Sequence, residues 1–250
     1  TGFSTGVLAA NSHVLFTKTL QRHSIITHDQ ETSEFLFLTV QRFHRNLPLG
    51  MKPSTDWKSG ARMRFPKLDS YIYIDSAKSD NLGIGHTLNC AHLSEMAKWP
   101  PRRAHDLFID ISQTVPNSGF ITVESTPKGR AGEFYDLYKG AKANENGYTA
   151  FFYPWWWDVT CIEEVNRVFE LTPEEKDLQK YVLERDKREL SLEQIAFRRK
   201  KIAEIGDYFY QEYPENDIDC WIGGGVSIFD GVALRRYLMH IQPGRQEGNL

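Results

Sequence analysis

The chain contains few cysteines and no long apolar run. Three of its 250 residues are cysteine, and Cys90, Cys161 and Cys220 are widely spaced with no CxxC pair. Their spacing argues against a disulfide framework or a zinc site and fits a reducing cytoplasm. No run approaches the roughly 20 apolar residues that span a bilayer, and the N-terminal sequence lacks a signal-peptide pattern. We therefore expect a soluble protein that is neither secreted nor bound to a membrane.

The charge also lacks a strong sign. The 30 basic and 33 acidic residues leave a formal net charge of −3, which gives no attraction of the whole protein to nucleic acid. Any contact with DNA must then come from a local basic patch. Apolar residues make up 40% and charged residues 25% of the chain, the composition of an ordinary globular protein with a real core.

Patterns typical of helices and strands alternate along the first part of the chain. Apolar spacing and capping residues predict helices over residues 4–20, 29–48, 102–115 and 131–144. Short apolar or β-branched segments predict strands over residues 23–28, 61–66, 70–77, 89–94, 119–125 and 148–154. This alternation predicts an α/β fold with a mostly parallel sheet flanked by helices.

The sequence changes character beyond Trp157, where two long polar helices begin. Thr172 and Glu175 form a capping box with proline at the first helical position, and Ser191 and Gln194 form a second box. The triple glycine at 223–225 predicts a hinge. We therefore predict a core over residues 1–160, a helical linker subdomain over 161–220, and a hinge with the start of a further domain over 221–250.

The first segment with candidate chemistry is Thr1-Gly2-Phe3-Ser4-Thr5, directly before the first predicted helix. Backbone N–H groups and the helix dipole at such a start can hold a phosphate, while a Ser or Thr hydroxyl can ligate Mg²⁺. The alternative is an ordinary helix cap, in which Ser4 or Thr5 satisfies free backbone donors. Taken alone, so short a match favours the cap.

The second segment is Ser94-Glu95, at the end of a predicted central strand. The C-terminal edge of a sheet is where α/β folds bind ligands, and a Glu there can orient and activate a water molecule. The alternative is an exposed Glu at the start of the next helix. Only the neighbouring segments can decide between these two interpretations.

The third segment is Ser125-Thr126-Pro127, where another predicted strand ends. Small hydroxyl residues at this place can sense a γ-phosphate and pass its loss to a moving domain. The alternative is an ordinary turn, because Ser, Thr, Pro and Gly all favour turns.

Taken together, six segments give a specific resemblance. In chain order they are TGFST, ITHDQETSEFLF, LNCAHLSEMAKW, ITVESTPKGRAGEFYDLY, FFYPWWWD and YFYQEYPENDIDCW. Their order and spacing resemble the large terminase subunit of tailed bacteriophages, the motor that packages DNA into procapsids. The likeness covers nearly the whole chain, and HLSE, STPKG and PWWWD are its most telling parts.

The resemblance implies a P-loop NTPase core of the RecA or ASCE type that uses ATP and Mg²⁺. The nucleotide would meet the Walker A loop, whose matching residues are Gly2, Phe3, Ser4 and Thr5. Ser4 would ligate Mg²⁺, and Glu95 would be the catalytic base that aligns water against the γ-phosphate. Ser125 and Thr126 match the coupling motif that relays hydrolysis to movement against DNA.

This sequence departs from the family pattern at three places. The chain begins inside the Walker A loop, so we expect it to be cut there and to bind nucleotide poorly without the preceding basic residue. Ser94 stands where many relatives carry aspartate, and we interpret it as holding a Mg²⁺-bound water while Glu95 keeps its role. Ile84 stands where relatives often carry an arginine that reaches a neighbouring subunit, which puts such an arginine in doubt.

The resemblance also implies partners: double-stranded viral DNA, the portal protein, the small terminase subunit, and further copies in a ring on the portal. The compartment would be the cytoplasm of the infected bacterial host. In this family a nuclease domain of the RNase H type follows the ATPase. Its catalytic carboxylates are not recognisable in residues 221–250, so we predict no nuclease activity for this chain.

The basic and aromatic segments each allow two interpretations, a contact with nucleic acid or an ordinary structural role. Arg102, Arg103, Arg198 and Arg199 could touch DNA phosphates, although solvated helix faces are the default interpretation. The three tryptophans at 155–157 could stack on bases or pack in a core, and packing is favoured. Two alternative functions stay open: a helicase-like P-loop DNA motor, and a non-catalytic DNA-binding or assembly protein with a decayed P-loop fold.

Overall fold

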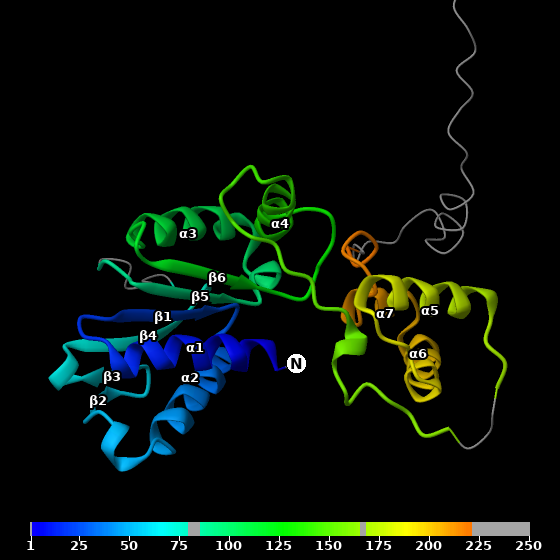
Figure 1. The fold of residues 1–250 in the computed structure, drawn as a ribbon. Helices are drawn as coiled ribbons and strands as arrows, with labels where there is room; N and C mark the ends of the chain where they lie inside the picture. The colour runs from blue at the N-terminus through cyan, green and yellow to red at the C-terminus, as the bar shows by residue number, and fades with distance from the viewer. Residues whose placement is uncertain (1, 80–85, 166–168, 222–250) are drawn as a thin grey trace, which may run out of the picture. The chain divides into compact units, whose positions relative to one another are not determined.

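The computed structural model describes residues 2–79, 86–165 and 169–221 (Figure 1). The chain forms two compact units, Thr1–Ala150 and a second that begins at Phe151. The predicted glycine hinge at 223–225 and the loop with Ile84 lie outside the described residues. Within these residues, no helix is both long enough and apolar enough to cross a membrane.

The first unit is built on a six-stranded sheet with the strand order β2-β3-β4-β1-β5-β6. Strands β4, β1, β5 and β6 pair with one another in parallel, whereas β3 pairs antiparallel with both β4 and β2. The predicted mostly parallel sheet is therefore confirmed, and β2 is an addition to the prediction. The bounds are β1 Arg22–Thr27, β2 Asp56–Ser59, β3 Arg62–Phe65, β4 Ser70–Ser76, β5 Cys90–Ser94 and β6 Phe120–Glu124.

Helices cover both faces of this sheet. Helices α1 (Phe3–Thr17) and α2 (Gln30–Arg45) lie on one face, and α3 (Pro101–Thr114) and α4 (Glu133–Ala143) lie on the other (Figure 1). All four helices were predicted. Short 3-10 helices occur between these elements at η1 Leu49–Met51, η2 Pro66–Leu68 and η3 Met96–Lys98. The second unit contains two more, η4 Trp155–Trp157 and η5 Gly206–Tyr208.

Two apolar cores result, one on each face. Consecutive residues of β1 point to opposite faces, so Ile25 packs with α1 and α2 whereas Ile26 packs with α3. The central strand β5 is buried along its whole length, as expected for a parallel strand covered on both sides. The covered sheet thus holds the ends of its strands in fixed positions.

The second unit packs α5 (Pro173–Asp186), α6 (Leu192–Ile205) and α7 (Phe209–Glu212) around a core that includes Trp155 and Trp156. Both predicted capping boxes are present. The side chain of Thr172 accepts from the backbone N–H of Glu175, and Ser191 accepts from that of Gln194. Each box satisfies backbone donors that a helix start leaves free.

One predicted strand is absent. Residues 148–154 form no strand, and the division between the two compact units falls inside this segment. A strand needs a neighbour to take its backbone hydrogen bonds, and the described sheet gives this segment none. The β-rich composition of YTAFFYP is thus overridden by the lack of a pairing partner.

Candidate active site

The parallel strands β5 and β6 end side by side, at the edge of the sheet where α/β folds bind ligands. Strand β5 ends at Ser94 and β6 ends at Glu124, and these two residues are direct partners in the register. Their side chains therefore emerge next to each other. The predicted residue Glu95 directly follows β5, and the predicted residue Ser125 directly follows β6.

The start of α1 lies at the same place. The hydroxyl of Ser4, in the first turn of α1, is close enough to the carboxylate of Glu124 to lower the pKa of that carboxylate. Gly2 is the N-cap residue, and no acidic residue occupies the first turn. A β-carbon added at Gly2 would meet nothing within 4 Å, so the protein leaves space around this backbone. The backbone N–H groups of the first turn, the helix dipole and this space suit a phosphate group.

Glu124 is the centre of the polar contacts at this edge. Its Oε1 atom lies 2.9 Å from Nε2 of His92, and the nearby hydroxyl groups of Ser4 and Ser94 also lower the pKa of its carboxylate. Burial raises the pKa of Glu124, but the hydrogen bonds from His92, Ser4 and Ser94 outweigh burial and hold this pKa below its ordinary value. The carboxylate is therefore ionised at neutral pH.

The sequence analysis did not single out Glu124 or His92. Both lie on strands that it predicted, and Glu124 is the last residue of its strand, directly before Ser125. The rule that drew attention to Ser94, namely a polar side chain at the C-terminal end of a parallel strand, would have found Glu124 as well. His92 is fully buried within β5, and its sequence context carried no such signal.

Glu95 has an uncommon backbone conformation for a residue with a side chain. Its φ of 54° and ψ of 40° place it in the left-handed region. Non-glycine residues there are typical of sites where the surrounding structure imposes strain of about 1 kcal/mol or more. Its Oε2 atom lies 3.0 Å from Nζ of Lys98. The turn thus holds a charged carboxylate directly after the end of β5.

The predicted coupling residue Ser125 is bonded to the turn that follows Glu95. Its Oγ atom accepts from the backbone N–H of Ala97 at 3.1 Å and donates to the carbonyl of Thr126 at 2.9 Å. Ala97 belongs to η3, which begins one residue after Glu95. Directly after η3, Nε1 of Trp99 donates to the carbonyl of Ser94, the last residue of β5, at 3.1 Å. The structure therefore joins the ends of β5 and β6 through η3.

The oxygen atoms at this edge suit magnesium. Ser4 and Ser94 offer hydroxyl oxygens and Glu124 offers a carboxylate, and Mg²⁺ binds hard oxygen ligands with one or two carboxylates, water and substrate phosphates completing its shell. The described residues contain no cluster of three or more His, Cys, Asp or Glu side chains that could hold a metal. The fit is thus to a cation shared with a phosphate ligand.

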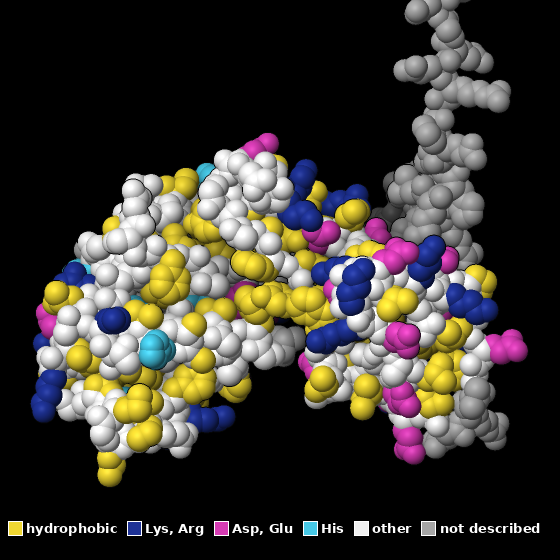
Figure 2. Space-filling view, viewed as in Figure 1, with side chains coloured by type: hydrophobic (Ala, Val, Ile, Leu, Met, Phe, Trp, Pro, Cys, Tyr) yellow, Lys and Arg dark blue, Asp and Glu magenta, His cyan; other side chains and the backbone are white. Residues whose placement is uncertain are grey.

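The four arginines predicted as DNA contacts are placed very differently. Arg102 is exposed on α3, whereas the guanidinium of Arg103 donates to the backbone carbonyls of Lys78 and Ser79 at 3.4 and 2.8 Å. Arg103 therefore ties α3 to the chain after β4. On the visible face of the second unit, basic and acidic side chains are mixed (Figure 2).

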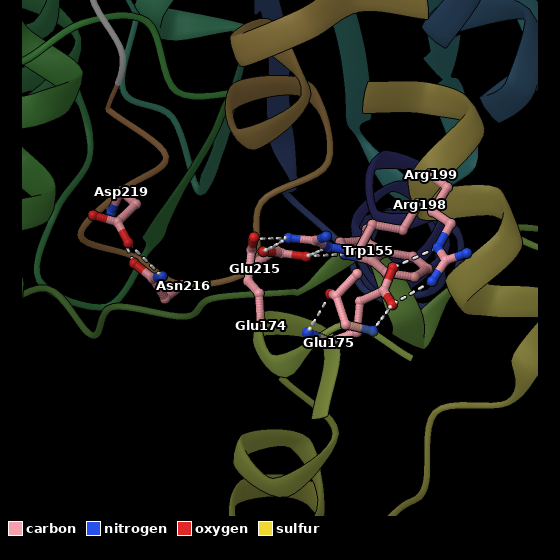
Figure 3. A network of polar contacts seen from close by, with 9 residues as sticks. Trp155, Glu174, Glu175, Arg198, Arg199, Glu215, Asn216 and Asp219 are labelled. Carbon is pink, nitrogen blue, oxygen red and sulfur yellow. Dashed lines mark hydrogen bonds and ion pairs between the residues drawn. The ribbon is translucent and has the colours of Figure 1, made fainter. Parts of the chain in front are cut away.

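Arg198 and Arg199 take part in a network of ion pairs (Figure 3). Arg198 is 4% exposed, and its Nε and Nη2 atoms lie 2.8 Å from carboxylate oxygens of Glu215 and Glu174. Arg199 forms a two-pronged pair with Glu175, with both N···O distances at 2.6 Å. This arrangement corrects the prediction for Arg198, because a buried guanidinium that is paired with two carboxylates is not available to a DNA phosphate.

The tryptophans pack as the favoured interpretation held. Trp155 and Trp156 are buried, and the indole N–H groups of Trp156 and Trp157 both donate to Oδ2 of Asp186, at 2.7 and 3.0 Å. Trp155 lies edge-on to Trp156 and Phe209. The indole N–H groups thus have partners within the unit, as buried tryptophans require.

Solved structures share this fold. No protein-family model and no curated protein matches the chain. The crystal structure of the HK97 bacteriophage large terminase superposes with a TM-score of 0.61 at 11% identity, over 86% of this chain and 44% of that one. The predicted α/β fold, with a mostly parallel sheet flanked by helices, is confirmed, and it is the fold of a bacteriophage large terminase.

Two further similarities are weaker. The large terminase ATPase domain of Thermus phage P74-26 has a TM-score of 0.48 at 16% identity, over 87% of this chain and 84% of that one. A large terminase from a thermophilic bacteriophage, in complex with ADP, has a TM-score of 0.47 at 12% identity, over 70% of this chain and 40% of that one. The chain thus spans less than half the length of the HK97 terminase and of this ADP-bound terminase.

Proposed function

We propose that the chain is the ATPase motor of a phage terminase large subunit, which couples ATP hydrolysis to the translocation of viral DNA into the procapsid. One observation carries the proposal: the start of α1, Ser94-Glu95 and Ser125 meet at one edge of the sheet. These are the three segments that the resemblance assigns to phosphate binding, hydrolysis and coupling. The terminase fold of the chain supports the same assignment.

In this proposal the first turn of α1 holds the phosphates of ATP. Backbone N–H groups from Gly2 to Thr5 point at the anion, with the positive end of the helix dipole behind them. Ser4 would ligate Mg²⁺ through its hydroxyl oxygen, Ser94 would hold a water bound to the ion, and the carboxylate of Glu124 lies beside both. When bound, Mg²⁺ neutralises charge on the phosphate oxygens.

Glu95 acts as the base. The oxygen of a water molecule forms a bond to the γ-phosphorus, the bond from that phosphorus to the β–γ bridging oxygen breaks, and a proton of the water passes to the Glu95 carboxylate. The strained turn fixes where this carboxylate points. Lys98, whose Nζ lies 3.0 Å from Oε2, forms an ion pair with this carboxylate.

Ser125 couples hydrolysis to motion. Because its hydroxyl accepts from Ala97, any displacement of Glu95 on loss of the γ-phosphate is transmitted to the segment after β6. Double-stranded DNA, the portal protein, the small terminase subunit and further copies in a ring are the partners that this function requires. Their contacts on this chain belong to the proposal as a whole.

The test compares Mg²⁺-dependent ATP hydrolysis by the full native chain and by two variants. Glu95→Gln removes the proton acceptor, and we expect kcat to fall by about 10²- to 10⁴-fold. The control is Glu189→Gln, at an exposed position of the second unit, which should hydrolyse ATP as the wild type does. Equal activity of Glu95→Gln and wild type would overturn the role of Glu95.

A second measurement separates packaging from the alternatives. Stimulation of the ATPase by purified portal protein supports a packaging motor, whereas separation of DNA strands by the same preparation would establish a helicase-like motor instead. A native chain without any ATP hydrolysis in Mg²⁺ would establish the non-catalytic alternative.

A further inference from the structure

The carboxylate that Ser94 lacks is present one strand away. Many nucleotide-hydrolysing motors place an aspartate at the end of the strand that corresponds to β5, where this chain has Ser94. Glu124 ends the neighbouring strand in direct register with Ser94, and both side chains lie at the same edge. The charge at this edge is thus provided by β6 instead of β5.

We propose that Glu124 is the positioning residue for the magnesium ion of the nucleotide site, where it takes the place of the missing carboxylate at position 94. This inference rests on the proposed function of the same site. In this proposal Glu124 accepts a hydrogen bond from the hydroxyl of Ser4 and so turns the oxygen lone pairs of Ser4 toward the cation. It holds the hydroxyl of Ser94 in the same way, toward a water bound to the cation.

The hydrogen-bond inventory of the site supports this geometry. A hydroxyl has one proton and two acceptor lone pairs, and a carboxylate has about four lone-pair sites and no proton. His92 bonds to Glu124, Ser94 is its partner in the register, and the Ser4 hydroxyl is near enough to lower its pKa. Hydrogen bonds from all three would still leave acceptor capacity on the carboxylate for a water bound to the metal. When the Ser4 hydroxyl donates its one hydrogen bond to Glu124, its oxygen can only accept, which is what a metal ligand needs.

The charge balance of the site points to a cation. The side chain of Glu124 is 14% exposed, and within the described residues its one ion-pair partner is His92, with no Lys or Arg at hand. The Nδ1 atom of His92 is buried without a hydrogen-bond partner among the described residues. A nearly buried carboxylate without a cationic partner is costly, and a bound divalent cation offsets that cost.

A structural role for Glu124 is the competing explanation, since its contacts also hold β5, β6 and α1 together. The two explanations differ in what magnesium does. A structural residue affects nucleotide binding equally with and without Mg²⁺, whereas a positioning residue for the metal affects only the part of the affinity that Mg²⁺ supplies.

The experiment measures the Kd of a fluorescent ATP analogue on the full native chain, in Mg²⁺ and in EDTA. We define the Kd ratio as the Kd in EDTA divided by the Kd in Mg²⁺. For Glu124→Gln we expect this ratio to fall by about 10- to 100-fold, the range for loss of a group that orients metal ligands. The Kd in EDTA should change little. For Ser94→Asp with Glu124→Gln we expect the ratio to recover, because the carboxylate returns to the same edge from β5.

The matched control is Glu133→Gln. Glu133 is also a glutamate paired with a histidine, His105, at 2.7 Å, and its side chain is buried to a similar degree, but the pair joins α3 to α4 and lies on neither β5 nor β6. Its Kd ratio should equal that of the wild type. If Glu124→Gln does not fold, as judged by circular dichroism, Glu124→Asp retains the charge but withdraws it by one methylene, and we expect a smaller fall in the same ratio.

The outcomes separate this inference from the function on which it rests. A wild-type chain that binds the analogue no better in Mg²⁺ than in EDTA overturns the nucleotide site itself. A wild type with Mg²⁺-dependent binding and an unchanged ratio in the folded Glu124 variant overturns only the role of Glu124. A double variant that remains as weak as Glu124→Gln also overturns it.

Discussion

The Oγ atom of Ser125 accepts the backbone N–H of Ala97 at 3.1 Å. This bond joins the end of β6 to η3, the turn that directly follows Glu95. The bond is partly buried, so the Ser125 hydroxyl helps to hold the turn in position. The residue predicted to relay hydrolysis is therefore in direct contact with the segment that carries the predicted base.

Ser125→Ala should lower kcat while leaving the KM for ATP nearly unchanged. The variant loses the hydrogen bonds to the Ala97 N–H and the Thr126 carbonyl. Loss of the bond to Ala97, about 1 kcal/mol, loosens the turn and reduces the rate by roughly 5- to 10-fold. Steady-state ATPase kinetics measure the split between the two constants. Ser112→Ala is the control, because the Ser112 hydroxyl bonds only within its own helix, to the carbonyl of Ile109. A raised KM with unchanged kcat would contradict this role for Ser125.

Ser94→Asp should leave hydrolysis largely intact, because Glu95 is unchanged. It should also lower stability in EDTA, since the new carboxylate would lie beside Glu124, its direct partner in the register, and like charges repel. Thermal unfolding with and without Mg²⁺ measures this effect, and Mg²⁺ should restore the Tm. Total loss of hydrolysis would contradict the interpretation of Ser94.

The free energy of unfolding should decrease as the pH falls below neutral, because the buried ring of His23 must stay neutral in the folded state. Burial lowers the pKa of His23 from 6.5 to about 4, so the folded state keeps this ring neutral while the unfolded state takes up a proton. The contribution is fully present above pH 6.5 and is lost as the pH falls toward 4. Each pH unit in this window costs about 1.4 kcal/mol.

His23→Leu tests that dependence. The free energy of unfolding from urea titrations at pH 7.5 and pH 5 should change less in His23→Leu than in the wild type, by about 2 kcal/mol. The same difference in both proteins would show that other groups carry the acid sensitivity.

Arg198→Met should destabilise the second unit by about 3–5 kcal/mol, because it leaves the buried carboxylate of Glu215 without its partner. Urea unfolding followed by tryptophan fluorescence measures this loss, since Trp155 also contacts Glu215. Arg188→Met, at an exposed position, is the control. The double variant Arg198→Met with Glu215→Gln should recover part of the stability, and a further drop would argue against a shared ion pair.

The sequence predicted elements well where local signals were strong. The capping boxes at Thr172 and Ser191 and the periodicity of α2 and α3 are local, so these helices were predicted close to their observed positions. The segment 148–154 has the composition of a strand, but strands depend on partners far away in the sequence, and composition does not reveal whether a partner exists. Strand β2 was missed for the same reason: it pairs with β3, and its composition alone does not reveal this partner.

The site divides in a similar way. Ser4, Ser94, Glu95 and Ser125 were predicted from their places before a helix or after a strand, and the structure brings them to one edge. The contact between Ser94 and Glu124 depends on the pairing of β5 with β6, which no local pattern encodes. The burial of Arg198 has the same origin, because its partners Glu174 and Glu215 come from distant segments.

The two contacts of Glu175 affect how the second unit unfolds locally. It closes the capping box at the start of α5 and also pairs with Arg199 of α6, and the hydrogen bond from Arg199 holds its pKa below the ordinary value. Fraying of the first turn of α5 would therefore break the link to α6 at the same time. In hydrogen exchange, we expect amides of these two helix segments to open together as one cooperative unit.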